Sequence, residues 1–364
     1  FFGGLFIFCI ASFAASLSTS SDFLIVARIF QAIGGSMQFP AGLALLLAAF
    51  PPSRLQTAIG AWGAMGGLAA ALGPTVGGLL VNAFDWQAVF WINVPVAAVV
   101  LLVGPRWVTE STSSTIQQKV DLISVPLASI GVGIAIFAIT QGNNWGWSSI
   151  GTLMSFALAG LLVCAFLIRS RRHPSPLFDL ELFKIRSFTI GNCGSVFFLI
   201  AFFSWLISLP TFIQAAWGWS VLKTGFAIAP GPFLTACVSP LGGRIADRIG
   251  NGPLLTLGGF LGASGLFCHL IFTGVEADYL KGILLPGLLI GVAAGLGFAQ
   301  LIGVTMKDVP RDQFGMGGAG RTTIFQLSLA LGIALAFTII GNPDRIPSDV
   351  LSGLKATWLM GIGC

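Results

Sequence analysis

Long apolar stretches follow one another along almost the entire chain and restrict its fold more than any other feature. Eleven such stretches lie at about 1–18, 23–50, 55–84, 86–108, 120–142, 149–169, 187–217, 222–243, 253–274, 280–306 and 314–341. A helix of about 20 residues crosses the ~30 Å hydrocarbon layer of a bilayer. Because backbone polar groups must be paired inside that layer, the sequence predicts an all-α, polytopic bundle of eleven transmembrane helices.

Composition excludes several other classes of protein. Charged residues make up 9% of the 364 residues, against roughly 25% in soluble domains. The six cysteines form no CxxC pair and the chain has two histidines, so neither a zinc site nor a disulfide framework is expected. No GxxxxGK[ST] loop for ATP is present. The net charge of +5 is not gathered on a polar face, and no nucleic-acid partner is expected.

The distribution of basic residues predicts the orientation of the bundle. Twelve Lys or Arg residues lie in the joints on one side, four lie on the other, and Arg28 and Arg321 fall within apolar stretches. Basic joints stay in the cytoplasm, so the first stretch is expected to begin on the cytoplasmic side. The same asymmetry accounts for the net positive charge.

The stretch at 55–84 is rich in glycine and contains a proline. Its most regular positions are Gly60, Gly73, Pro74, Gly77 and Gly78. Small residues allow two membrane helices to approach closely, and proline removes a backbone donor and bends the helix. The pattern favours a helix that takes part in conformational change, with plain helix packing as the alternative.

Two arginines lie at membrane depth in the predicted bundle. A guanidinium there costs at least ~2.5 kcal/mol, which favours a functional or paired residue. Arg28 stands about five residues, or roughly 7.5 Å, from the outer helix end. Arg321 stands near the inner end of its helix. The alternative for both is that the side chain reaches the interface.

One cytoplasmic joint carries a compact charged pattern. Its residues are Gly243, Arg244, Asp247, Arg248 and Gly250. Asp247 is expected to cap a helix N-terminus while the two arginines reach partners, which would latch two halves of the bundle on the inner side.

These patterns resemble the major facilitator superfamily, and within it the fourteen-helix drug:proton antiporters. Residues 60–78 resemble the antiporter motif G-x8-G-x3-G-P-x2-G-G, with Ala69 in place of one glycine; residues 28–34 resemble R-x2-Q-G-x-G, with Ala32 in place of a glycine; residues 243–250 resemble the loop signature G-x3-D-R/K-x-G. The resemblance implies that Arg28 takes part in proton coupling.

Counting helices against that branch predicts the organisation of the chain. Residues 1–108 would be an N-terminal half of four spans, 109–186 a central two-span insertion with a cytoplasmic linker, and 187–364 a C-terminal half of five spans and the start of a sixth. The chain would then be a fragment without the first two helices and the last. The acidic proton carrier that the family usually has in its first helix would be missing.

The resemblance implies a proton-coupled exporter of drugs or other lipophilic or cationic compounds, working by alternating access in the cell membrane. It would act as a monomer, without metal or cofactor, and use the proton gradient as its energy source. Gln31, Gln38 and Asn192 are candidate polar contacts in a cavity of apolar and aromatic side chains.

Other functions remain open at this point. One is a dedicated exporter of a single metabolite or siderophore, and another is a non-functional truncated remnant. A membrane enzyme would need a buried cluster of titratable groups, and only His269 lies near a helix interior, without an acidic neighbour in the sequence. We therefore expect no enzymatic activity.

Overall fold

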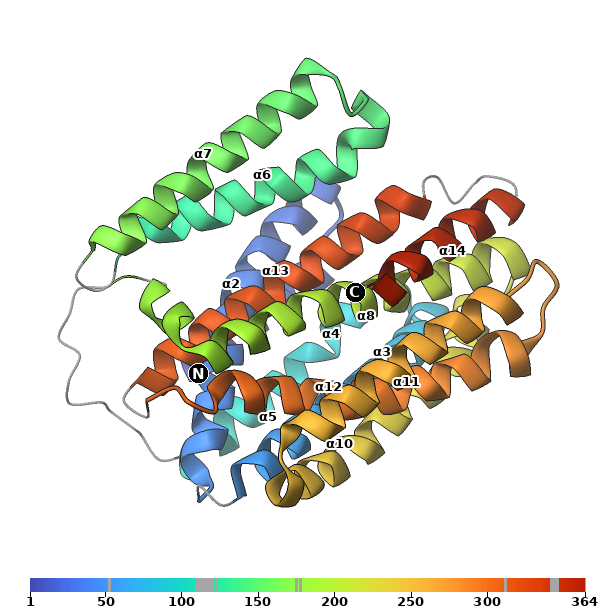
Figure 1. Cartoon of the computed structure of the whole chain (residues 1–364). Helices are drawn as coiled ribbons and strands as arrows, with labels where there is room; N and C mark the ends of the chain where they lie inside the picture. Colours follow the sequence, from blue (N-terminus) through green and yellow to red (C-terminus); the bar gives the residue numbers. More distant parts are fainter. Residues whose placement is uncertain are drawn as a thin grey trace.

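The computed structural model describes residues 1–363 with the exception of 52–53, 109–120, 122, 174–175, 177–178, 311–312 and 341–346. Every regular element in these described ranges is helical (Figure 1). Ten spans in this part of the chain are long and apolar enough to cross a membrane, and they coincide with ten of the eleven predicted stretches. The all-α membrane fold is thereby confirmed. The first stretch forms a shorter apolar helix, Phe2–Ser16, of 15 residues.

The helices fall into a first set, a pair and a second set along the chain. The first set is α1 (Phe2–Ser16), α2 (Ser21–Ala49), α3 (Leu55–Ala83), α4 (Ala88–Trp91) and α5 (Asn93–Val103), followed by the 3-10 turn η2 (Gly104–Arg106). The pair is α6 (Ser124–Trp145) and α7 (Ile150–Arg172). The second set, after η3 (Leu180–Lys184), is α8 (Arg186–Trp217), α9 (Val221–Ile228), α10 (Pro230–Ile249), α11 (Asn251–Phe272), the π-helical turn η4 (Leu280–Leu284), α12 (Leu285–Met306), α13 (Phe314–Ile340) and α14 (Pro347–Gly363).

Serine and glycine mark several helix ends. The side chains of Ser20, Ser149 and Ser220 accept hydrogen bonds from backbone N–H groups at the starts of α2, α7 and α9, which are groups that have no partner inside a helix. Gly146, Gly218 and Gly250 have positive φ angles of 86°, 65° and 83° where α6, α8 and α10 end. This backbone conformation costs glycine little because it has no Cβ.

The first and second sets meet along a seam between α3 and α10. A Cβ added to Gly60 would lie 2.7 Å from the Ser239 carbonyl oxygen, and one added to Gly67 would lie 2.7 Å from the Ala236 nitrogen. A Cβ added to Gly63 would lie even closer to the Ser239 hydroxyl oxygen. These glycines are spaced by three and four residues and so share one helix face. The backbones of α3 and α10 are therefore in direct contact.

The rest of the predicted glycine motif packs less closely. A Cβ on Gly78 would lie 3.3 Å from the Leu222 Cα in α9, but Cβ atoms on Gly73 and Gly77 would meet nothing within 4 Å. The Pro74 carbonyl oxygen lies 3.0 Å from the Cβ position of Gly225 in α9. The motif thus contacts α10 through Gly60 and α9 through Pro74 and Gly78, while Gly73 and Gly77 have free space beside them.

The α6–α7 pair lies along one edge of the molecule beside α13 (Figure 1). Asn143 Nδ2 donates to the Thr338 carbonyl oxygen at 2.6 Å, and the Thr338 hydroxyl donates to the Ile139 carbonyl oxygen at 3.1 Å. At the other end of the pair, Arg169 Nε lies 2.8 Å from one carboxylate oxygen of Asp121 and 2.9 Å from the other.

Asp121 is held as a carboxylate at that end. Its side chain is buried, and burial by itself raises a carboxyl pKa, but hydrogen bonds from Ser124 and the pairing with Arg169 outweigh burial and lower the pKa from 3.8 to about 2. The carboxylate therefore ties the start of α6 to the end of α7.

The seam predicts an asymmetry between two adjacent glycines. Gly67→Ala should lower the free energy of unfolding by about 1–3 kcal/mol, because the added methyl group would overlap the α10 backbone. Gly66→Ala is the matched control, since nothing lies within 4 Å of its Cβ position. Melting temperatures of the purified variants in detergent test this. Equal melting temperatures for the two variants would show that the seam is not closely packed.

The Asp121 pairing predicts a pH dependence. A depressed pKa in the folded state stabilises the protein above the ordinary pKa, and that stabilisation is lost as pH falls from about 4 towards about 2. The melting temperature of the wild-type protein should exceed that of Asp121→Asn above pH 4, and the difference should shrink as the pH approaches 2. A difference that is constant over this range would contradict the assigned pairing.

Candidate functional site

Two of the cavities between described helices have linings drawn from four or more helices. One, of about 320 Å³, is lined by α2 and α3 of the first set and by α8, α10, α12 and α13 of the second. We call it the shared cavity. The other, of about 490 Å³, is lined by α8, α11, α12 and α14, and we call it the larger cavity.

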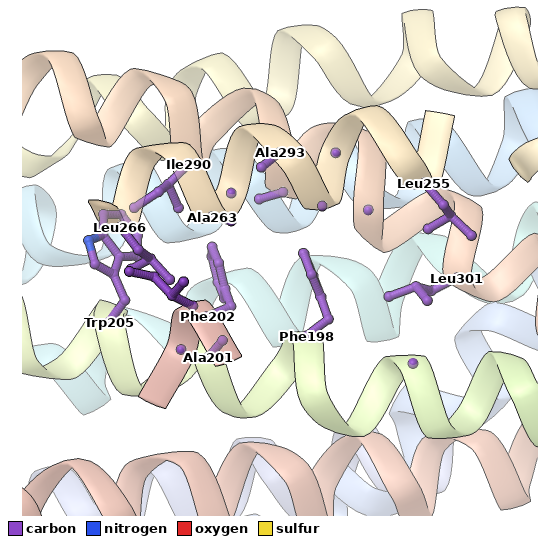
Figure 2. A pocket seen from close by; sticks show the side chains of 18 of the residues that line it. Phe198, Ala201, Phe202, Trp205, Leu255, Ala263, Leu266, Ile290, Ala293 and Leu301 are labelled. Atoms are coloured by element: carbon purple, nitrogen blue, oxygen red, sulfur yellow. The ribbon is translucent and has the colours of Figure 1, made fainter. Parts of the chain in front are cut away.

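The larger cavity has apolar walls and no charged side chain among its described lining residues. Figure 2 shows Phe198 and Phe202 pointing from α8 towards the opposite wall, where Ala263 and Ala293 lie. Gly258, Gly259 and Gly262 of α11 also line that wall, and because they have no side chains they leave space in the cavity. Such a cavity has room for an apolar molecule, but it offers few polar groups to orient one.

Aromatic rings from both helix sets meet in the shared cavity. Phe325 of α13 stacks near Phe39 of α2, with 6.0 Å between ring centroids, and lies 5.8 Å from the Phe203 ring of α8. Phe39 in turn meets Trp62 of α3 edge to face at 5.7 Å. These ring faces and edges form a surface suited to planar apolar molecules.

Arg321 gives the shared cavity its one charged side chain among the described lining residues. It stands one helical turn before Phe325, on the same face of α13. The residue is 5% exposed, and its buried Nε has no hydrogen-bond partner among the described residues. The structure therefore rules out the alternative that this arginine reaches the interface.

Arg28 has the opposite environment. It is exposed on α2, and it donates a 2.6 Å hydrogen bond to Gln31 Oε1. Gln31 Nε2 then donates to the Ser12 hydroxyl of α1 at 2.7 Å. The guanidinium also lies 5.5 Å from the Phe90 ring centroid of α4. The arrangement links three helices of the first set, away from the lining of the shared cavity.

The structure places the three predicted polar contacts outside the linings of both cavities. Gln31 is buried in the chain from Arg28 to Ser12. Asn192 is buried in α8, where its Nδ2 donates to the Phe188 carbonyl oxygen at 2.9 Å. Gln38 is half-buried on α2. The sequence predicts apolar and aromatic walls in general, but it does not identify Arg321 or the individual aromatic residues of the shared cavity, because no local pattern shows which faces of distant helices meet.

The charged joint that is predicted to be cytoplasmic connects the two helix sets. Asp247 lies in the last turn of α10, and its carboxylate accepts a 2.7 Å hydrogen bond from the Thr57 hydroxyl at the start of α3. The carboxylate thus lies at the N-terminal turn of α3, where its described partner is a side-chain hydroxyl, whereas α11 begins at Asn251 without a side-chain cap. Arg244 and Arg248 form no hydrogen bond or ion pair with the described residues. Gly243 packs beside Gly60 in the seam.

His269 is fully buried and both of its ring nitrogens are occupied. Trp205 Nε1 donates to His269 Nε2 at 3.0 Å, and Nδ1 lies 2.9 Å from the Gly282 carbonyl oxygen in the π-helical turn. The imidazole stacks on Trp358 of α14 with 4.7 Å between centroids. An indole N–H only donates, so Nε2 is the acceptor and Nδ1 carries the proton. Within the described ranges, no group of three His, Cys, Asp or Glu side chains could hold a metal ion.

Comparisons of the sequence with a family profile and with individual proteins agree on one family. The sequence profile of the Major Facilitator Superfamily matches residues 1–127 and 122–333. The chain is 28% identical over 362 residues to the lincomycin resistance protein LmrB of Listeria monocytogenes, covering 96% of this chain and 76% of that protein. It is 32% identical over 344 residues to the multidrug resistance protein Stp of Mycobacterium tuberculosis, covering 93% of this chain and 62% of that protein.

Two further comparisons agree with these. The tetracenomycin C resistance and export protein of Streptomyces glaucescens is 30% identical over 339 residues, with 92% of this chain and 62% of that protein covered. Among solved structures, the human organic anion transporter MFSD10 superposes with a TM-score of 0.66 at 14% identity, covering 100% of this chain and 75% of that chain. At this identity the superposition shows the fold alone.

The His269 environment predicts coupling with Trp205. His269→Leu would leave the Trp205 N–H without its acceptor and should lower the free energy of unfolding by about 1–3 kcal/mol. Trp205→Phe should also be destabilising, and the double variant should cost less than the two single effects added together. Detergent melting curves of the three variants provide the cycle. Strict additivity would contradict the hydrogen bond.

Proposed function

This chain belongs to the Major Facilitator Superfamily, and from that premise we propose that it exports drugs or other lipophilic compounds through the shared cavity by alternating access. It is a multi-pass protein of the cell membrane and a transporter by family and fold rather than an enzyme. Drug-resistance relatives from three bacterial species support export as its direction of transport.

The shared cavity is the observation that carries this proposal. Its walls come from both helix sets, with Phe39 and Trp62 on one side and Phe203 and Phe325 on the other. A molecule held between them would contact both sets at once, and rocking one set against the other would then expose it to alternate sides of the membrane.

The contacts at the seam support such rocking. The glycines of α3 give a smooth surface against α10, and smooth surfaces can shift without large side-chain rearrangement. The Thr57–Asp247 hydrogen bond ties α3 to α10 at the end of the seam that is predicted to face the cytoplasm. We assign Gly60, Gly73, Pro74, Gly77 and Gly78 to the moving face, and Asp247 with its glycine and arginine neighbours to the latch.

We propose that a proton gradient supplies the energy, without a bound cofactor, and that the protein works as a monomer. The relay from Arg28 through Gln31 to Ser12 is the candidate proton-coupling element, because it joins a cation to two hydrogen-bonding groups across α2 and α1. We also assign the chain to the fourteen-helix branch, with α6 and α7 as the extra pair. The chain spans 62–76% of the length of the three relatives described above.

An efflux assay tests the proposal. Cells that lack their own efflux pumps, express this chain and are preloaded with the neutral lipophilic dye Nile red should lose dye faster when energised, and a protonophore should stop the loss. Arg28→Ala should abolish energised efflux with normal membrane insertion, and Pro74→Ala should slow it. Arg28→Lys is the control that keeps the positive charge.

Each result has a separate meaning. No energised efflux by the wild-type chain would overturn export as its function. Efflux by Arg28→Ala at the wild-type rate would overturn the role of Arg28 in coupling while leaving export in place. If Nile red leaves the cells but several unrelated dyes, tested in the same way, do not, the protein is a dedicated exporter of one class of compound.

A further inference from the structure

Among the described residues, none compensates the positive charge in the shared cavity. Arg321 is 95% buried by exposed area, stands roughly 10 Å along α13 from its start, and forms no ion pair or hydrogen bond with the described residues. None of the described lining residues is Asp or Glu. A buried guanidinium without an anion or acceptors is unfavourable, so such residues have partners at some stage of their function.

The position of Arg321 shows where that partner would lie. The residue lines the cavity. Phe325 lies one turn further along α13, and its ring stacks near that of Phe39 in α2 of the first set. The same cavity therefore has a guanidinium, whose N–H groups are all donors, in its wall next to a set of aromatic rings. A planar molecule with an acidic substituent would satisfy both features, its ring among the phenylalanines and its oxygens on the guanidinium.

We propose that the shared cavity binds aromatic compounds that carry an acidic group, such as a carboxylate or an ionised phenol, and that Arg321 is the residue that recognises this group. The proposal rests on the proposed function and names its substrate class. It also departs from the expectation of cationic substrates, because a cation in this cavity would meet a like charge and no carboxylate among the described lining residues.

Arginine suits this role better than lysine. Its planar fork can donate two parallel hydrogen bonds to one carboxylate, whereas a lysine ammonium acts as a point charge. The variant Arg321→Lys should therefore keep part of the preference for an acid, and Arg321→Gln should lose it. Phe325→Leu removes a ring without changing the charge, so it should weaken binding of acidic and neutral aromatic compounds alike.

A matched pair of ligands provides the test. 2-Naphthoic acid is a carboxylate at pH 7, and 2-naphthamide has the same ring system without the charge. Both are titrated calorimetrically into the purified full chain in detergent, with detergent blanks. The wild-type protein should bind the acid about tenfold or more tightly than the amide, which is the range for a hydrogen bond to a charged group.

The variants separate recognition from folding. Arg321→Gln should bind the acid about tenfold more weakly than the wild-type protein, with the affinity for the amide unchanged, and unchanged amide binding shows that the cavity is intact. Arg321→Lys should lie between the two. If Arg321→Gln retains the wild-type ratio of acid to amide affinity, or if the wild-type protein prefers the amide, Arg321 does not recognise an acidic group.

The outcome is distinguishable from failure of the proposed function. If the wild-type chain exports Nile red and binds the amide, but the acid gains nothing from Arg321, only the substrate class is overturned. If it binds neither naphthalene compound, the shared cavity is not a site for aromatic molecules, and this inference fails together with the role of the cavity in export.

Discussion

The direct contact between the backbones of α3 and α10 is the interaction on which the rest of the arrangement depends. It joins residues about 180 positions apart in the chain, and it exists because Gly60, Gly63 and Gly67 have no side chains to hold the helices apart. The close approach of α3 to α10 places Trp62 in one wall of the shared cavity, which also has rings of α8 and α13 in its lining. The seam thus positions the site as well as joining the two sets.

The two arginines inside apolar stretches show how tertiary context changes the meaning of one residue type. By sequence, both stand near a helix end and both could reach the interface. In the structure, Arg28 is exposed and bonded to Gln31, while Arg321 is buried and has no partner among the residues that the structure describes. The cost of leaving a guanidinium unpaired falls on Arg321 alone. This difference directs attention to the shared cavity and to ligands that carry negative charge.

Prediction from sequence was strongest for the spans and weaker for the site. Ten of the eleven apolar stretches form candidate membrane spans, and the serine and glycine residues at their ends act locally. The residues of the predicted glycine motif differ in how closely they pack. Gly60 and Gly78 lie in close helix contacts, but Gly73 and Gly77 face open space. Asp247 lies across the seam at the N-terminal turn of α3, where the Thr57 hydroxyl donates to it. Gln31, Gln38 and Asn192 lie outside the cavity linings.

The sequence by itself determined that the chain crosses the membrane repeatedly as helices, because hydropathy and the need to pair every backbone group in hydrocarbon are local properties of each segment. It also determined where most helices begin and end. Only the tertiary structure decided which faces meet, because contacts between distant helices depend on shape and small-residue packing that one segment does not encode. The gathering of Phe39, Trp62, Arg321 and Phe325 around one cavity is a result of that packing.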